Sequence, residues 1–265
     1  MDTDLAGVRE LLTHGSLEIE GRLVDASNAT LVAEASGGSV SARCVYKPVA
    51  GERPLWDFPD GTLGHREVAA YLVGAATGWD VVPPTVWRED GPFGPGMCQL
   101  WIDVDEERTL VDITAPDDVP DGWLRVMDAF DHVGDPVVLV HADVPELLRM
   151  ALFDVVVNNA DRKGGHVLLA PDGDVFGVDH GVTFNVDHKL RTVLWGWAGE
   201  AVPDDALHDL TDLRARFDGE LGDRLAEHLT RGEITRTVRR LDQLVTTATM
   251  PLPGEGWPSI PWPAF

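Results

Sequence analysis

The chain has 265 residues, of which 44% are hydrophobic and 25% charged, a composition typical of one large globular domain or two small lobes. Its formal net charge of −24 repels the phosphates of nucleic acids and anionic membranes, so we expect neither as a partner. No apolar run approaches the roughly 18 residues of a membrane span, and no signal peptide precedes the first elements, which predicts a cytoplasmic location.

The first elements predict a short helix and an antiparallel meander. Apolar residues recur at helical spacing over residues 4–13, and three alternating strands are expected over 17–24, 30–33 and 40–47. The polar turn at residues 25–28 suits either a phosphate-binding loop or a plain hairpin turn. Both cysteines, Cys44 and Cys98, fall in apolar strand-like runs without a nearby partner in sequence, which predicts buried free thiols.

Two charged residues follow the meander. Lys47 ends the third strand on the face of Val45, where it is either solvated, as most lysines are, or able to reach a phosphate. A helix is predicted over residues 65–73, with Glu67 in its first turn. There the carboxylate either complements the helix dipole or forms an ion pair with Lys47.

The middle of the chain changes from strands to helices. Short strands are expected over residues 85–88 and 97–102, with an extended piece over 109–113. The later helices are predicted from apolar stripes over residues 123–133, 144–155, 204–217, 221–231 and 233–246. We therefore predict an α+β protein with an N-terminal antiparallel sheet lobe, a mainly helical C-terminal lobe and an irregular tail rich in Pro and Trp, over residues 1–105, 106–250 and 251–265.

The central stretch joins a polar loop to a hairpin. Asp161 lies in the loop, and Asp179 ends the second of two strands expected over residues 167–170 and 175–178. The hairpin folds back the 18 positions between the two acids, so their carboxylates are expected to face one another. Such a pair suits a divalent cation and a positioned base, as phosphoryl transfer requires.

The order of these parts resembles the phosphatidylinositol 3-/4-kinase-like division of the protein-kinase superfamily, in particular its actinobacterial phosphatidylinositol-kinase-like branch. The likeness extends over about residues 15–230. The motifs that carry it are, in order, Tyr46-Lys47-Pro48, Arg66-Glu67, Gln99–Ile102, Asn159–Arg162 and Val178-Asp179. It implies a two-lobed protein-kinase-like fold and an ATP-dependent kinase, with GTP as the alternative nucleotide and Mg²⁺ or Mn²⁺ as the metal.

The resemblance also implies a role for each matching residue. Lys47 would bind the α- and β-phosphates and Glu67 would pair with it. Asp161 would accept the proton of the acceptor hydroxyl, and Asp179 would hold the metal. The remaining implied residues are catalytic-loop Arg162 and Lys163, the adenine-binding hinge Gln99, Leu100, Trp101 and Ile102, with Trp101 near the base, and Leu168 beneath the purine.

Three departures from the family pattern affect the chemistry. His166 stands where the family has a metal-binding Asn, and an imidazole suits Mn²⁺ better than Mg²⁺. Lys163 replaces a His and adds a charge near the γ-phosphate. His180 follows Asp179 in place of the usual Phe, and the phosphate loop lacks a dense glycine motif, which predicts slow turnover.

Other functions stay open on the sequence. A nucleotide-binding pseudokinase would also explain the altered metal ligand. A metal-dependent hydrolase would use the cluster His166, Asp179, His180, Asp187 and His188. Among kinase acceptors, the acidic chain without a basic helix argues against a membrane phosphoinositide. A protein, the chain itself or a small soluble molecule is the expected acceptor.

Overall fold

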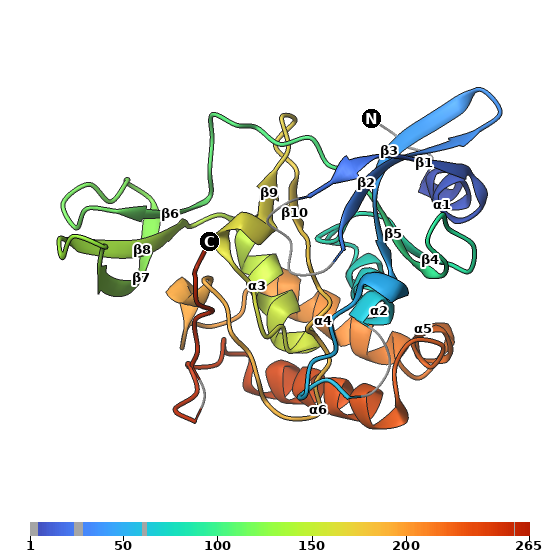
Figure 1. The fold of residues 1–265 in the computed structure, drawn as a ribbon. Helices are drawn as coiled ribbons and strands as arrows, with labels where there is room; N and C mark the ends of the chain where they lie inside the picture. Colours follow the sequence, from blue (N-terminus) through green and yellow to red (C-terminus); the bar gives the residue numbers. More distant parts are fainter. Residues whose placement is uncertain (1–4, 24–28, 60–62, 257) are drawn as a thin grey trace.

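A five-stranded antiparallel sheet forms the N-terminal part of the computed structural model, which describes residues 5–23, 29–59, 63–256 and 258–265 (Figure 1). The strands lie in the order β1-β2-β3-β5-β4. Their bounds are β1 Ser16–Arg22, β2 Leu31–Gly37, β3 Val40–Pro48, β4 Thr85–Arg88 and β5 Gly96–Leu100. The predicted meander is confirmed, and the turn at residues 25–28 lies outside the described residues.

One face of this sheet packs on a small core under helix α1 (Leu5–His14). Leu12 of that helix and Cys44 and Cys98 of the sheet are completely buried together. Both cysteines are free, as predicted. Although they are far apart in sequence, the two thiols lie close enough to hydrogen-bond, and this contact lowers the pKa of Cys44.

Helix α2 (Leu63–Thr77) crosses between the sheet and the helices and is buried along most of its length. It begins two residues earlier than predicted, so Glu67 lies beyond the first turn, which contains no acidic residue. The helix-dipole interpretation of Glu67 is therefore wrong, since that effect fades within one turn.

A three-stranded antiparallel sheet follows the N-terminal sheet in the chain and projects to one side of the molecule (Figure 1). It consists of β6 (Val111–Thr114), β7 (Trp123–Phe130) and β8 (Pro136–Ala142), in the order β6-β8-β7. The helix predicted over residues 123–133 is wrong, because most of that stretch is β7. A register shift between Arg125 and Met127 breaks the alternation of this strand and leaves apolar residues at helical spacing.

The helices that follow form the main core. They are α3 (Pro145–Val157), α4 (Asp204–Arg216), α5 (Glu220–Leu225) and α6 (Arg231–Thr247). Three of them match their predictions. Helix α5 ends six residues before the predicted helix end at residue 231, and the chain continues there in turns. A capping box between Thr230 and Glu233 fixes the start of α6. The described tail after residue 250 forms neither helix nor strand, as expected.

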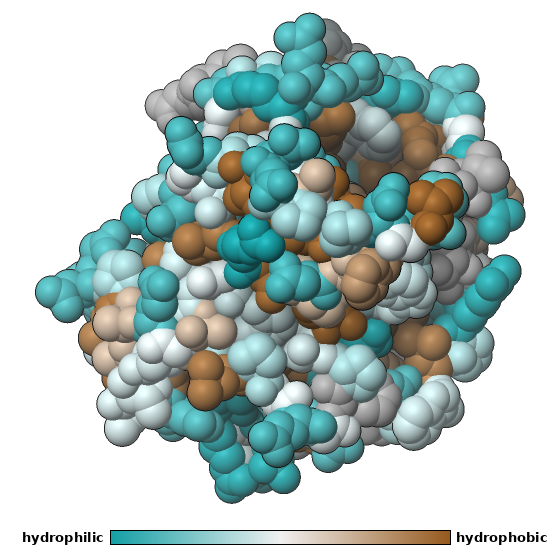
Figure 2. All heavy atoms as spheres, turned by 90° about the vertical axis from the view of Figure 1, so that its left-hand side faces the viewer, coloured by the Kyte–Doolittle hydropathy of each residue, from teal (hydrophilic) through white to brown (hydrophobic). Residues whose placement is uncertain are grey.

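The surface is largely polar on the face shown in Figure 2. Figure 2 shows hydrophilic side chains over much of one face, with hydrophobic ones scattered in small groups among them. Scattered apolar groups are ordinary on a folded protein and need no partner. None of the helices in the described ranges is long and apolar enough to cross a membrane.

Candidate active site

Three segments far apart in sequence meet at the Lys47 ammonium. Lys47 comes from β3, Glu67 from α2, and Asp179 follows β10 (Val175–Gly177), which pairs with β9 (Val167–Leu169) in the predicted hairpin. Lys47 Nζ lies 2.6 Å from Glu67 Oε1 and 2.8 Å from Asp179 Oδ1. The ammonium therefore links the N-terminal sheet, α2 and the hairpin.

The three charges support one another electrostatically. Burial alone would lower the pKa of Lys47, but Asp179 and Glu67 raise it above its ordinary value. Lys47 in turn holds the pKa of Asp179 well below its usual range. Burial raises the pKa of Glu67, which Lys47 partly offsets. The Lys47 ammonium thus favours the charged forms of both carboxylates.

Glu67 also fixes the chain after the metal-binding candidate. Its second oxygen, Oε2, accepts a hydrogen bond of 2.8 Å from the backbone N–H of His180. The Glu67 side chain is only 2% exposed, whereas that of Asp179 is 52% exposed. Glu67 is therefore the anchored partner, and Asp179 is the partner open to a ligand.

The loop after α3 carries Asp161. Asn158 ends α3 in the left-handed region at φ 54°, which Asn tolerates better than most residues. Asn159 Oδ1 then accepts the N–H of Asp161 at 3.0 Å. Burial raises the pKa of Asp161, the charge of Lys163 lowers it and the charge of Asp179 raises it, so the two acids interact electrostatically.

Arg162 does not face this opening. It is completely buried, and its Nε and Nη2 each lie 2.9 Å from a carboxylate oxygen of Asp154, in a bidentate pair. Arg162 Nη2 also lies 2.6 Å from His180 Nε2. Because Arg is always a donor, His180 must accept, and its proton lies on Nδ1. These contacts support a positioning role for Arg162.

Sequence reasoning missed Asp154 and the part played by His180. The available signal was an acid inside an otherwise apolar helix, between Phe153 and Val155. A carboxylate that is fully buried needs a partner. The partner is eight residues away, across the end of α3, so only the folded chain reveals it.

A metal could be held at the edge of the site by Asp179 and His166. His166 Nε2 lies 3.5 Å from Asp179 Oδ2, and its buried Nδ1 has no hydrogen-bond partner among the described residues. Burial lowers the pKa of His166 to about 4, so the imidazole is neutral at pH 7 and able to ligate. One carboxylate and one imidazole fit Mn²⁺ better than Mg²⁺.

The hydrolase interpretation finds no support in this geometry. The described residues contain no group of three or more His, Cys, Asp or Glu side chains able to hold a metal. His180 points to Arg162, while Asp187 and His188 line a separate hollow. The five residues predicted for a hydrolase therefore lie in three separate places in the structure and do not form one metal site.

The predicted hinge is partly committed to the sheet. The N–H of Leu100 donates to Pro84 and that of Trp101 to Arg43, at 2.9 and 3.0 Å, and the buried Gln99 side chain donates to Thr85. Among the hydrogen bonds between described residues outside helices and strands, none uses the backbone N–H of Ile102. Trp101 lies under the Arg43 guanidinium, 4.7 Å from the ring centroid, and Leu168 is half-buried on β9.

Comparison with known proteins places the chain in a family and its fold in a class. No protein-family model matches it. It is 49% identical over 264 residues to Protein Rv2133c of Mycobacterium tuberculosis (strain ATCC 25618 / H37Rv), covering 96% of this chain and 94% of that protein.

Two solved structures share the fold. The Golgi casein kinase with Mn/ADP bound has a TM-score of 0.57 and 13% identity over 93% of this chain and 75% of that one. Hydra Fam20 with sugar has a TM-score of 0.53 and 16% identity over 94% and 89%. At such identities the likeness is one of fold alone. The chain has an α+β, kinase-like fold and belongs to the family of Protein Rv2133c.

Proposed function

We propose that this protein is an ATP-dependent kinase. The observation that carries the proposal is the Lys47 ammonium held between Glu67 and Asp179, with Asp161 on a neighbouring loop where the charge of Asp179 affects it. A fixed cation beside two carboxylates from separate elements matches the needs of phosphoryl transfer, which are positioning and charge neutralisation. The kinase-like fold adds support, and one structural neighbour binds Mn/ADP.

Each site residue would have a separate role in phosphoryl transfer. Lys47 would bind the α- and β-phosphates, and Glu67 would keep its ammonium in place. Asp161 would orient the acceptor hydroxyl and take its proton, and its raised pKa makes it a better base than an ordinary Asp. Lys163 Nζ, 3.5 Å from Asp161, would attract the γ-phosphate.

Asp179 and His166 would hold a divalent metal, Mn²⁺ or Mg²⁺, and the metal would neutralise charge on the phosphates. The base of ATP, or of GTP as the alternative, would lie at the hinge near Trp101 and Leu168. The lobes over residues 1–105 and 106–250 would enclose the nucleotide. Arg162 would act through Asp154 and His180, away from the reacting atoms.

The finer assignment is the phosphatidylinositol 3-/4-kinase-like type, which rests on the order of the motifs. The acceptor would be a protein, the chain itself or a small molecule in the cytoplasm. A pseudokinase is the second candidate, because His166 replaces an oxygen ligand and leaves one carboxylate at the metal site.

The test is incubation with γ-labelled ATP and Mn²⁺ or Mg²⁺, comparing the wild type with Asp161→Asn. Asp172→Asn, in the exposed hairpin turn, is the matched control. We expect ATP to raise the unfolding temperature of all three proteins and only Asp161→Asn to lose turnover. Nucleotide binding without turnover in the wild type would favour the pseudokinase, and no binding would refute both candidates.

A further inference from the structure

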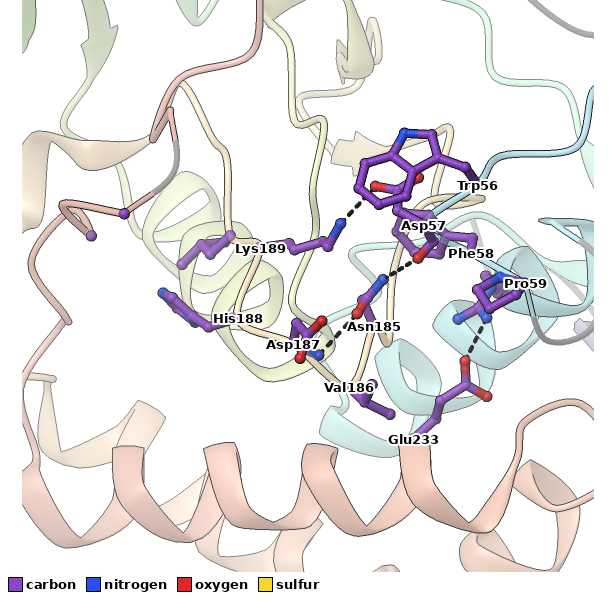
Figure 3. Close-up of a pocket in the computed structure, with 14 residues that line it drawn as sticks. Trp56, Asp57, Phe58, Pro59, Asn185, Val186, Asp187, His188, Lys189 and Glu233 are labelled. Carbon is purple, nitrogen blue, oxygen red and sulfur yellow. Dashed lines mark hydrogen bonds and ion pairs between the residues drawn. The ribbon is translucent and has the colours of Figure 1, made fainter.

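A second hollow, of about 680 Å³, lies between the loop before α2 and helix α6 (Figure 3). That volume is suited to a small molecule. Its walls come from the loop over residues 56–59, the segment over 185–190, Glu233 of α6, and Gly254 and Gly256 of the tail. Lys47, Asp161 and Asp179 are not among its described lining residues.

The floor of this hollow is built on the catalytic loop. Asn158, three positions before Asp161, donates its Nδ2 to the carbonyls of Asn185 and Asp187, at 3.0 and 2.7 Å. Asn158 Oδ1 accepts the N–H of Lys189 at 3.0 Å. The segment that lines the hollow is thus held in fixed register with the base candidate.

Arg191 connects the two regions. Its N–H donates to the Asn159 carbonyl at 2.9 Å, and its charge lowers the pKa of Asp161. The residue before it, Leu190, lines the hollow. Through Arg191, the segment that lines the hollow is therefore joined to the loop that carries Asp161.

The tail follows the same path. It lines the hollow at Gly254 and Gly256, and Ile260 accepts a hydrogen bond of 3.4 Å from Arg191 Nη2. It then reaches the catalytic loop, where the Gly164 N–H donates to Ala264 at 2.8 Å. One continuous segment thus borders both the hollow and the loop that would receive an acceptor.

The charges of the lining select a class of ligand. The two cations are committed, since Lys189 Nζ lies 2.6 Å from Asp57 Oδ2 and Arg66 pairs with Glu233. Asp187 is exposed, and no ion pair is found for its carboxylate among the described residues. His188 is neutral at pH 7, because burial and Arg240 lower its pKa. The lining charge that has no opposite charge beside it among the described residues is therefore the negative charge of Asp187.

An aromatic wall strengthens this selection. Trp56 is 85% exposed at the rim, and Lys189 Nζ lies 5.2 Å from its ring centroid (Figure 3). This indole face already interacts with one cation, and its remaining surface is open. A flat aromatic face attracts organic cations, and the Asp187 carboxylate attracts them from another part of the same lining.

We infer that this hollow binds the phosphate acceptor, a small molecule that carries both a hydroxyl group and a positive charge. The inference rests on the proposed kinase activity. In the reaction the acceptor oxygen forms a bond to the γ-phosphorus, the bond from that phosphorus to the bridging oxygen of ADP breaks, and the hydroxyl proton passes to Asp161. An anionic headgroup or an acidic peptide would meet repulsion from Asp187.

The experiment uses a small-molecule filtrate of mycobacterial cells, the source of the 49% identical relative, with γ-labelled ATP and Mn²⁺. One portion is passed through a cation exchanger at pH 7 and another through an anion exchanger. We expect the label to appear in a small molecule. The filtrate should lose its acceptor on the cation exchanger and keep it on the anion exchanger. Asp187→Asn should raise the KM for that fraction about two- to fivefold, as expected for one exposed ion pair. Asp172→Asn should leave it unchanged.

The experiment distinguishes failure of the acceptor-site inference from failure of the proposed kinase activity. Label found only in protein, an acceptor removed by the anion exchanger, or an unchanged KM in folded Asp187→Asn would overturn this inference and leave the kinase standing. A wild type that binds ATP but releases no ADP with any fraction would overturn the proposed function itself. The unfolding temperature of Asp187→Asn checks that the variant is folded.

Discussion

Replacing Lys47 with Met removes the cation shared by Glu67 and Asp179, and the structure sets the size of the effect. Breaking a buried ion pair costs about 3–5 kcal/mol, because it leaves an unpaired charge inside the protein. Glu67, at 2% exposure, meets this condition. Asp179, at 52% exposure, contributes at most about 1 kcal/mol, since solvent screens its pair.

We therefore expect Lys47→Met to lower the free energy of unfolding by about 3 kcal/mol at pH 8, because Glu67 keeps its hydrogen bond from His180. For a chain of this size that corresponds to roughly 6–12 °C in unfolding temperature. The matched control is Lys163→Met, whose ammonium lies 3.5 Å from Asp161 in a more exposed pair and should cost less than about 1 kcal/mol.

The pH dependence identifies the responsible group. Burial raises the pKa of Glu67, and loss of Lys47 raises it further. A carboxyl with a raised pKa in the folded state destabilises the fold above that pKa, and the penalty disappears as pH falls through it. The difference between wild type and Lys47→Met should therefore shrink from pH 8 to pH 5 in thermal melts. Adding Glu67→Gln should restore much of the loss. An equal loss at both pH values, or none, would refute the reasoning.

The other predictions concern single residues of the site. Asp161→Asn should reduce label transfer about 10²–10⁴-fold, and a variant rate within twofold of wild type would contradict the role of Asp161 as base. The wild-type rate should fall as the pH is lowered, because Asp161 then becomes protonated. Asp179→Asn should abolish the metal-dependent part of the ATP-induced rise in unfolding temperature. His166→Asn should shift the metal that gives the larger rise from Mn²⁺ toward Mg²⁺, because an amide oxygen is a harder ligand; an unchanged preference excludes His166 as a ligand. Arg162→Met should cost about 3–5 kcal/mol in chemical unfolding, since it leaves Asp154 buried and unpaired.

Elements decided by local spacing were predictable. The stripe over residues 144–155 marks α3, observed over Pro145–Val157, because the helical period is a property of the segment alone. The stripe over residues 123–133 was misleading for a physical reason. The bulge after Arg125 gives β7 apolar residues at helix-like spacing. The partner strand β8, which stabilises β7, could not be inferred from the sequence of this segment.

The site was predictable only in part. The order of motifs suggested Lys47, Glu67 and Asp179, and the structure brings these three side chains together. The bidentate pair of Arg162 with Asp154 and the hollow at residues 185–190 depend on segments that meet only in the folded chain. Periodicity within one segment carries no information about such contacts.

The ammonium of Lys47 already has two counterions in the structure, and this has a thermodynamic consequence. If the proposed nucleotide binds here, its phosphate would take over the place of Asp179 beside that ammonium and would free the carboxylate for a divalent ion. Nucleotide and metal would then bind by an exchange of partners, each making the other's arrival more favourable. By reciprocity, the factor by which metal tightens nucleotide binding must equal the factor by which nucleotide tightens metal binding.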